Sequence, residues 1–435
     1  MSIRKHVARG AVVAAIALLA EPVLAQQPIS RSIPDSTISF TGEVRVRGEY
    51  DRPGSGVGGD GVTFLRSRFG AKARLGGGVR MMVQFQDSRV FGERGNTASG
   101  TASQLDLHQG YLEFGGRWQS RDVALRAGRQ EISIGNERLV GAAGWTATGR
   151  SFDGVRVDLT PIGGAWHATA FGATIGEYGR RGPAGAAATT RPDESLFGLA
   201  VDRAGLEGLL VHDRGARFRE YAEVKRTTAY ARYRTPALLD FTLDLEGAYQ
   251  FGIQDRITSG SSSVLQQDVN AWMAGARLAR NATTSLPAAI TLGVDWLSGD
   301  SNASDGEYRA FNTLQATNHK WYGTMDVFLD PSTRTRDGGL VDALGGIAVK
   351  LSPRATVRLD AHHFWTASDV ASSAAGTSRA LGWEGDLTVP VQLSSVAGVE
   401  FGYSVFRPGA GAPTLGLGRE GALRQWGYAQ LRAGF

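Results

Sequence analysis

The sequence predicts an all-β protein: a closed transmembrane barrel of about 18 antiparallel strands, with short periplasmic turns and long external loops. Three observations predict it. Apolar and polar residues alternate over many long segments, and the 435 residues include 59 Gly with 9% aromatic residues but no Cys. The longest strongly apolar stretch, residues 11–20, is about half of the ~20 residues that a transmembrane helix needs. Collagen-like, disulfide-stabilised and helical-bundle classes are therefore excluded.

The first residues of the chain have the features of a secretory signal peptide. Three basic residues come before the apolar stretch, and the small-residue segment 23–25 that follows suits a signal peptidase. This order predicts a signal peptide over 1–25 and a mature barrel over 26–435. A short buried core helix is the alternative. Without Cys, the exported chain must obtain its stability from burial and closed hydrogen bonding.

Strand-like alternation runs along the mature chain, with apolar residues on one face and charged residues on the other. In 241–251 the odd positions are mostly apolar and the even positions mostly polar, and 65–75 repeats the pattern with four basic residues on its polar face. Strands of about ten residues suit a membrane, since soluble strands typically have ~5–6 residues. A soluble all-β fold is the alternative. Similar alternation covers 40–50, 79–91, 272–278, 290–296, 357–365, 381–387 and 397–405.

The connections between these segments alternate in length, as in outer-membrane barrels. Long connections such as 92–104 and 175–194 alternate with short ones such as 76–78. A strand at 319–328 would break this alternation, so we expect 299–339 to be one long external loop. This choice leaves an even number of strands, with both chain ends in the periplasm.

The last segment alternates up to a terminal Phe435. It resembles the C-terminal insertion signal of bacterial outer-membrane proteins, so Phe435 is the predicted assembly signal. A closed barrel also leaves no unpaired strand edge in lipid. The expected location is the bacterial outer membrane.

Several motifs resemble those of the alginate-export outer-membrane channel family. The most specific block combines Gly, Arg, Asp and aromatic residues at spacings that strand alternation does not require. The resemblance implies an 18-stranded barrel with an arginine-rich lumen and alginate or a similar acidic polysaccharide as the solute. The matching segments are 125–131, 135–141, Trp145 and 150–156, with further matches at 86–92, 246–252, 298–300, 311–312 and 319–323.

Many arginines fall on the polar faces and are expected to line the lumen, where guanidinium groups attract carboxylates. Arg129 and Arg150 flank the family-like loop 133–149 and are the expected constriction residues. Asp153 is expected to orient Arg150 or Arg156 by a charge-assisted hydrogen bond, or to be an acceptor at a turn or strand edge. Arg45 and Arg47 are expected on the same wall but away from this loop. For any single arginine the alternative is a structural ion pair. The selectivity candidates are Arg129, Arg150, Arg156, Asp153, Arg47, Arg66, Arg68, Arg74 and Arg358.

The sequence does not predict a metal or cofactor. Asp300, Asp305 and Glu307 are oxygen donors for Ca²⁺, but they lack the spacing of a defined calcium loop, which favours a solvated loop. Motifs of hydrolases and nucleotide-binding enzymes are missing, and a lipase-like barrel enzyme is the remaining enzymatic alternative. Nucleic-acid binding is not expected, because the basic residues alternate inward instead of forming an external patch.

The predicted function is therefore an outer-membrane channel for anionic solutes, chiefly an acidic polysaccharide such as alginate or its fragments. The alternative is a general or small-acid uptake porin. Export of a polymer requires periplasmic partners, whereas uptake of acidic sugars does not, and the same basic lumen serves both directions. The other expected contacts are with outer-membrane lipid.

Overall fold

The computed structural model describes most of the chain beyond residue 36. The described residues are 37–54, 58–92, 105–119, 121–161, 166–176, 193–215, 221–237, 240–257, 264–282, 287–302, 304–372 and 376–435. The predicted signal peptide over 1–25 lies outside them. So do most of the long loops at 92–104 and 175–194.

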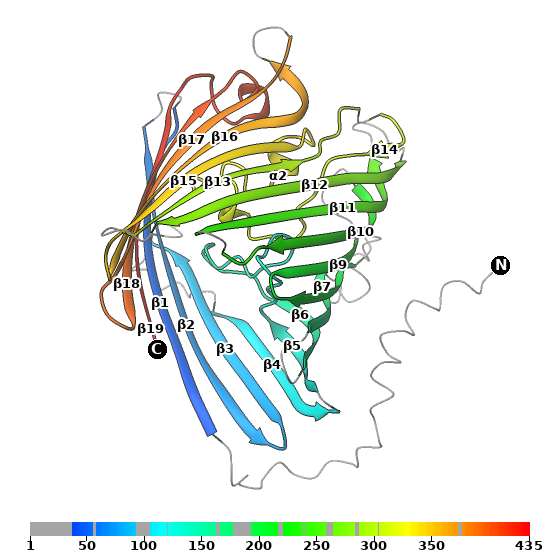
Figure 1. Cartoon of the computed structure of the whole chain (residues 1–435), viewed down its shortest axis with the longest axis vertical. Coiled ribbons are helices and arrows are strands. Elements are labelled where there is room, and N and C mark those ends of the chain that lie inside the picture. Colours follow the sequence, from blue (N-terminus) through cyan, green and yellow to red (C-terminus); the bar gives the residue numbers. More distant parts are fainter. Residues whose placement is uncertain are drawn as a thin grey trace, which may run out of the picture.

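Eighteen long strands in the described residues form one closed antiparallel barrel (Figure 1). The fold class predicted from alternation is confirmed. The strands are β1 (Thr37–Arg52), β2 (Asp60–Gly76), β3 (Val79–Val90), β4 (Leu105–Trp118), β5 (Arg121–Gln130), β6 (Phe152–Pro161), β7 (His167–Gly176), β8 (Glu194–Arg203), β9 (Leu206–Gly215), β10 (Tyr221–Arg234), β11 (Phe241–Ile257), β12 (Val264–Ala282), β13 (Ala288–Leu297), β15 (Leu340–Ser352), β16 (Ala355–Ser372), β17 (Gly376–Gln392), β18 (Ala397–Pro408) and β19 (Arg424–Gly434).

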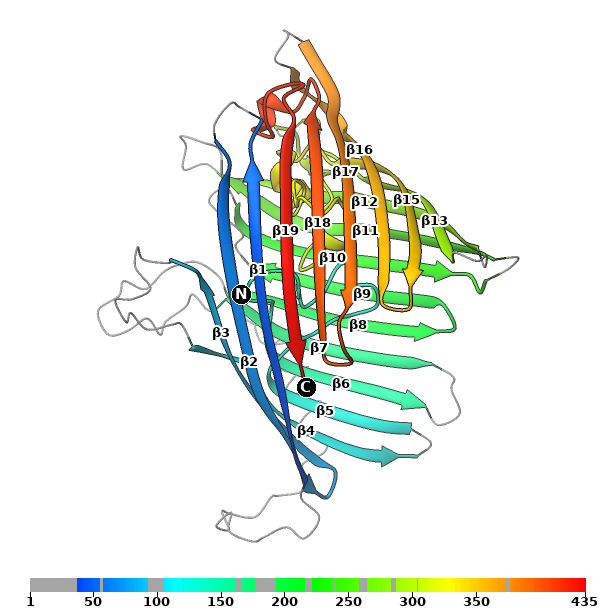
Figure 2. The same ribbon diagram turned by 90° about the vertical axis from the view of Figure 1, so that its left-hand side faces the viewer.

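Each long strand pairs with the next long strand along the chain, and β1 pairs with β19 to close the barrel. The closing register runs from Glu43 opposite Gly434 to Arg52 opposite Gln425. Figure 2 shows β1 and β19 side by side. The two-residue strand β14 (Glu307–Tyr308) is not part of the wall, because it pairs in parallel with β12 while β13 pairs with β15.

Strand periodicity explains the two faces of the wall. On β11, Leu243, Leu245 and Tyr249 are exposed on the outside, whereas Glu246 and Gln250 are buried on the inside. Successive strand side chains point to opposite faces, so the apolar set meets lipid and the polar set lines the lumen.

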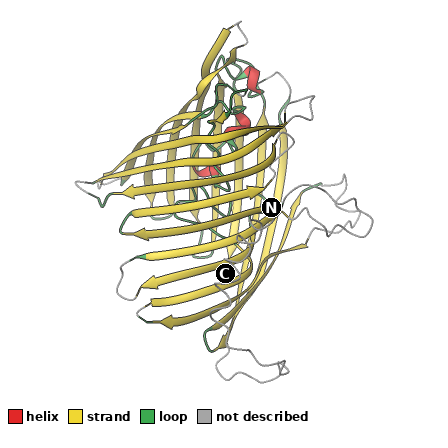
Figure 3. Cartoon of the chain, turned by 90° about the vertical axis from the view of Figure 1, so that its right-hand side faces the viewer, coloured by secondary structure: helices red, strands yellow, loops and turns green. Residues whose placement is uncertain are grey.

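Helical structure is sparse beside the strands (Figure 3). In the described residues, the short helical elements are η3 (Asn318–Lys320), α2 (Pro331–Arg334) and η4 (Pro413–Leu415). In the described part of the chain, no helix has the length and apolar character needed to cross a membrane.

The tight turn between β2 and β3 depends on glycine. Gly76, Gly77 and Gly78 all have positive φ angles. A Cβ atom on Gly78 would lie 1.9 Å from the carbonyl oxygen of Gly115, whose own amide donates to Gly78 O at 2.7 Å. Glycine therefore lets this hairpin approach β4 closely at the periplasmic end of the barrel.

The expectation that 299–339 is an external loop is wrong. The segment leaves the barrel wall at the end that carries the long loops and then folds into the lumen, where Phe311, Tyr322 and Thr335 are fully buried. Its apolar side chains pack against inward-facing wall residues such as Phe364 and Phe406. The inner wall thus offers an apolar surface that the segment covers, and the absence of a wall strand at 319–328 is confirmed.

The C-terminal residue takes part in barrel closure. The amide of Phe435 donates to Gly42 O at 3.0 Å, and the amide of Gly42 donates to Phe435 O at 3.0 Å. A Cβ atom on Gly42 would lie 2.3 Å from Cε1 of the Phe435 ring. The ring therefore packs over β1 because position 42 has no side chain.

Deletion of Phe435 should reduce the amount of assembled barrel in the outer membrane, because two closing hydrogen bonds and the predicted assembly signal are lost together. Gly42→Val should give a weaker defect, since it displaces the ring but keeps the residue. Assembly is measured as the heat-modifiable fraction on electrophoresis of outer membranes. Phe401→Ala, which truncates an exposed phenylalanine on β18, is the matched control. Normal assembly of the Phe435 deletion would contradict the predicted assembly role.

Candidate functional site

Two chain segments fold into the lumen and join each other there. The first inward segment, 131–151, connects β5 to β6, and the second inward segment, 298–339, connects β13 to β15 and contains α2 (Figure 1). The amide of Gln315 donates to Leu139 O at 2.9 Å, and the amide of Gly141 donates to Gln315 O at 2.9 Å. The two segments therefore form one body inside the barrel.

Four arginines on β1 and β2, which we call the basic wall, hold the first inward segment. Arg45 and Arg66 lie directly opposite each other in the strand register, where like charges are destabilising. Main-chain carbonyl groups of the segment accept their hydrogen bonds. Arg45 donates to Gly144 O (2.8 Å) and Thr146 O (2.5 Å), Arg47 to Trp145 O (2.6 Å), Arg66 to Gly144 O (3.1 Å) and Arg68 to Thr148 O (3.0 Å).

The basic wall therefore differs from what the sequence suggested. Arg47, Arg66 and Arg68 are on the lumen side as predicted, but they bind protein carbonyl oxygens. The expectation that Arg45 and Arg47 lie away from the family-like loop is wrong, because both contact it. The physical reason is that a row of neighbouring guanidinium groups needs more acceptors than the carboxylates of β1 provide.

Trp145 connects the basic wall to both inward segments. The Arg47 guanidinium lies 4.0 Å from the centroid of its ring. The ring of His319, from the second inward segment, stacks on it at 4.1 Å, and Tyr428 of β19 meets it edge-on at 5.0 Å. Cation–π and stacking contacts thus fix the tip of the first inward segment.

A buried ion-pair cluster anchors the other end of the first inward segment. Arg138 is 1% exposed, and its guanidinium lies 2.5 Å from Asp295 Oδ2 and 3.2 Å from Glu246 Oε1. Arg277 of β12 pairs with the same two carboxylates at 2.6 and 3.0 Å. Burial lowers the pKa of Arg138, but the neighbouring carboxylates raise this pKa above its ordinary value. The guanidinium group therefore stays cationic. The sequence motif 135–141 marked this position without revealing its partners.

The second inward segment is anchored on β17. The amide of Met325 donates to Glu384 Oε1 at 2.9 Å, and Thr324 Oγ1 donates to Asp386 Oδ1 at 2.7 Å. Beside these polar contacts, the ring of Phe328 packs 4.6 Å from that of Phe364. Nothing in the sequence indicated that these two carboxylates bind the second inward segment.

Arg150, an expected constriction residue, joins the two inward segments. Its Nη1 donates to Gly141 O at 3.0 Å and to Ala316 O at 3.3 Å, and it also contacts Gln315 O. The side chain thus lies at the inward loop, as predicted. The structure shows it bridging the main chain of both segments.

Arg129 and Asp153 are not in the lumen, which corrects their assignment as selectivity residues. On β5, Gln130 is fully buried on the inner face, so the preceding Arg129 points outward. On β6, Phe152 is buried on the inner face, so the following Asp153 points outward. Arg129 Nη1 donates to Asp153 Oδ2 at 2.8 Å. Asp153 therefore orients Arg129 on the outer surface, and not Arg150 or Arg156.

The remaining candidates lie on the lumen side, outside the basic wall. Arg156 pairs with Asp158 of its own strand at 2.8 Å. Arg358 is 61% exposed and lies 3.7 Å from Asp360. Arg74 is exposed near the β2–β3 turn, and no residue in the described ranges pairs with its guanidinium. These arginines are open to a solute to different degrees.

The proposed calcium donors surround an arginine. Arg309 lies 2.9 Å from Asp305, 2.9 Å from Glu307 and 4.0 Å from Asp300. The hydrogen bond that Arg309 donates to Asp305 raises the pKa of Arg309. No group of three or more His, Cys, Asp or Glu residues in the described ranges is arranged to hold a metal ion. Ion pairing with Arg309 accounts for these carboxylates.

Replacing both Arg45 and Arg66 by Ala should loosen the first inward segment, because hydrogen bonds to charged groups typically stabilise by ~1.5–3 kcal/mol each. The expected results are a higher single-channel conductance in planar bilayers and faster proteolysis between residues 131 and 151. Arg358→Ala is the matched control, since it removes a lumen-side charge that does not contact the inward segments. Conductance and proteolysis equal to those of the control would contradict the holding role of the basic wall.

Comparison with known proteins gives a consistent result. The alginate export family matches residues 36–413. No curated protein matches the chain in sequence. Among solved structures, a BenF-like porin from Pseudomonas fluorescens Pf-5 has 11% identity and a TM-score of 0.56, covering 92% of this chain and 98% of that one. OccAB1 from Acinetobacter baumannii has 13% identity and a TM-score of 0.57, covering 93% and 97%. OpdK from Pseudomonas aeruginosa, in its structure with vanillate, has 11% identity and a TM-score of 0.51, covering 93% and 99%.

At these identities the likeness to the solved porins shows the fold. The family match covers most of the chain and agrees with the resemblance found in the motifs, and together they indicate an outer-membrane channel. This chain belongs to the alginate export family.

Proposed function

We propose that this channel passes anionic solutes, foremost an acidic polysaccharide such as alginate or its fragments. The supporting observation is the set of arginines that lie directly opposite one another on neighbouring strands of the lumen wall. The pairs are Arg45 with Arg66, Arg45 with Arg432, Arg74 with Arg80, and Arg126 with Arg156.

Like charges directly opposite on a sheet repel, so each of these pairs creates a demand for negative charge or acceptor atoms. Inside a low-dielectric wall the resulting positive potential is focused along the passage. The Arg45–Arg66 pair, which contacts the first inward segment, is satisfied by its carbonyl oxygens and by Glu43. Arg80 pairs with Glu113 and Arg432 pairs with Glu43, but the two arginines are 50% and 64% exposed. A passing carboxylate, which guanidinium matches in shape, can therefore still reach them.

The family supports the polysaccharide as solute, since its name describes alginate export and alginate is an acidic polymer. A small-acid porin is the second candidate. It is favoured by the two inward segments, which occupy the lumen and narrow the passage, and by the vanillate in the OpdK structure. Transport of a polymer would require periplasmic export partners. No covalent chemistry is part of either proposal.

Reversal potentials in a salt gradient across planar bilayers should show a preference for anions. The preference should weaken toward 1 M salt, where screening shortens to ~3 Å. Arg358→Glu and Arg432→Glu should each reduce it, because these side chains face the lumen. Arg129→Glu makes the same charge change on the outer surface and should leave selectivity unchanged. A wild-type preference for cations would rule out the anionic solute.

The two candidate solutes differ in how they interrupt the current. Oligouronates should block single channels for longer times than a small aromatic acid if the polysaccharide is the natural solute. The reverse order would favour the small-acid porin.

A further inference from the structure

We propose that the periplasmic mouth of the channel contains a binding site for one sugar-acid unit, a carboxylate with neighbouring hydroxyl groups. The site lies between a pair of arginines and a pair of aspartates. This inference rests on the proposed function and gives it a specific site and ligand chemistry.

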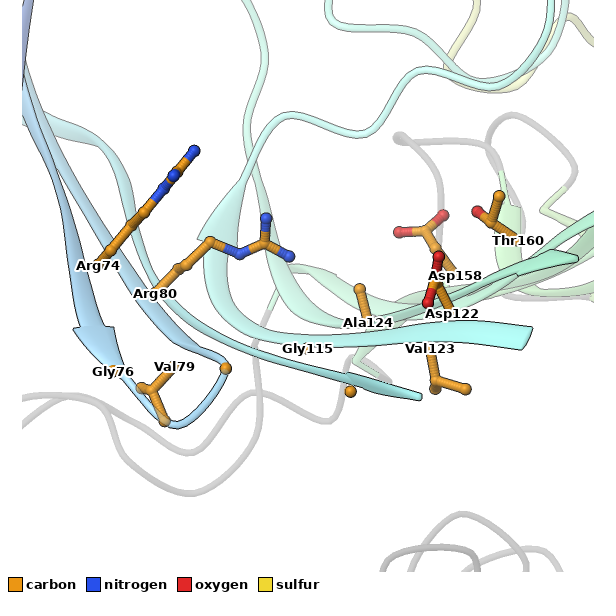
Figure 4. Close-up of a pocket in the computed structure, with 12 residues that line it drawn as sticks. Arg74, Gly76, Val79, Arg80, Gly115, Asp122, Val123, Ala124, Asp158 and Thr160 are labelled. Carbon is orange, nitrogen blue, oxygen red and sulfur yellow. The ribbon is translucent and has the colours of Figure 1, made fainter. Parts of the chain in front are cut away.

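A cavity of about 710 Å³ lies at the turn end of the barrel, between the β2–β3 hairpin and strands β4 to β6. Figure 4 shows Arg74 and Arg80 extending from the hairpin, with Asp122 and Asp158 across the space from them. The close contact between Gly78 and Gly115 holds the hairpin against β4. The two sides of the site are therefore placed by the barrel wall and do not depend on a long loop.

The arginine side carries an excess of positive charge. Arg74 and Arg80 are directly opposite in register. Arg80 lies 2.5 Å from Glu113, but Glu113 also pairs with Arg126 at 2.6 Å. The single carboxylate of Glu113 thus pairs with two guanidinium groups. No described residue pairs with the guanidinium group of Arg74. An anionic group on a ligand would relieve this repulsion.

The aspartate side selects against a simple anion. Asp122 is 61% exposed and lies 3.5 Å from Arg117. Asp158 is oriented by Arg156 and by Thr169 Oγ1, which donates to it at 2.7 Å. Ionised carboxylates only accept hydrogen bonds, so they suit hydroxyl donors and repel a second negative group.

Together the two sides match a ligand with a negative group at one end and hydroxyl groups at the other. A neutral sugar lacks a partner for the arginines. A simple carboxylate lacks donors for the aspartates. A sugar acid such as a uronate satisfies both, and the 710 Å³ cavity has room for one unit.

The test is calorimetric titration of the whole detergent-solubilised protein with glucuronate, acetate and glucose. Glucuronate should bind most tightly. Arg74→Ala should weaken glucuronate binding about tenfold, which corresponds to ~1.4 kcal/mol. Asp122→Asn should also weaken glucuronate binding but should leave acetate binding unchanged or tighter, because a repulsive charge is removed. Heat-modifiability on electrophoresis verifies that each variant is folded.

Lys350→Ala is the charge-matched control, since it removes a cation from the periplasmic end of β15, away from this cavity. Its glucuronate affinity should stay within about twofold of wild type. Equal effects of Arg74→Ala and Lys350→Ala would overturn the site, as would equal binding of acetate and glucuronate to the wild type. If either result were found while the wild-type channel still preferred anions in bilayers, the binding site would be wrong but the proposed function would stand. A wild-type preference for cations would contradict the proposed function itself.

Discussion

The structure depends on one constraint: every backbone amide and carbonyl group that lies in lipid must find a partner within the protein. The pairing of β1 with β19 meets this constraint by removing both sheet edges, and the bonds between Gly42 and Phe435 extend it to the last residue. Closure also determines the two faces of the wall. Once the barrel is closed, strand alternation separates an apolar outer face from an inner face that carries the polar groups. Where the second inward segment packs, the inner face also carries apolar residues such as Phe364 and Phe406.

The inner face creates a second requirement. A barrel of this size is too wide to be filled by the side chains of its own strands, so its polar groups need other partners. The two inward segments supply many of them. Carbonyl oxygens of the first segment accept from the basic wall, and amide and hydroxyl groups of the second donate to Glu384 and Asp386. The wall and its contents are therefore complementary.

This complementarity divides the charges of the lumen into two sets. Some arginines hold the inward segments in place. Arg45 does so from the barrel wall, and Arg138 and Arg150 do so from within the first inward segment. Arginines beyond the segments, such as Arg74 and Arg358, stay accessible to solvent. Selectivity is expected to reside in this second set, because a charge already neutralised by protein atoms contributes little field to the passage.

The sequence by itself determined the barrel, its number of strands and the facing of most wall residues, because strand alternation is a local property with a period of two. The same period placed Arg129 outside, three residues from the inward Arg126, although its position beside the family-like loop suggested otherwise. Only the tertiary structure decided that 298–339 folds inward and that carbonyl groups near Trp145 bind Arg45 and Arg66. These contacts join residues that are 78 to 101 positions apart. The backbone carbonyl groups that accept these hydrogen bonds are the same for every residue type, so the identity of the side chains carries no signal of the contacts.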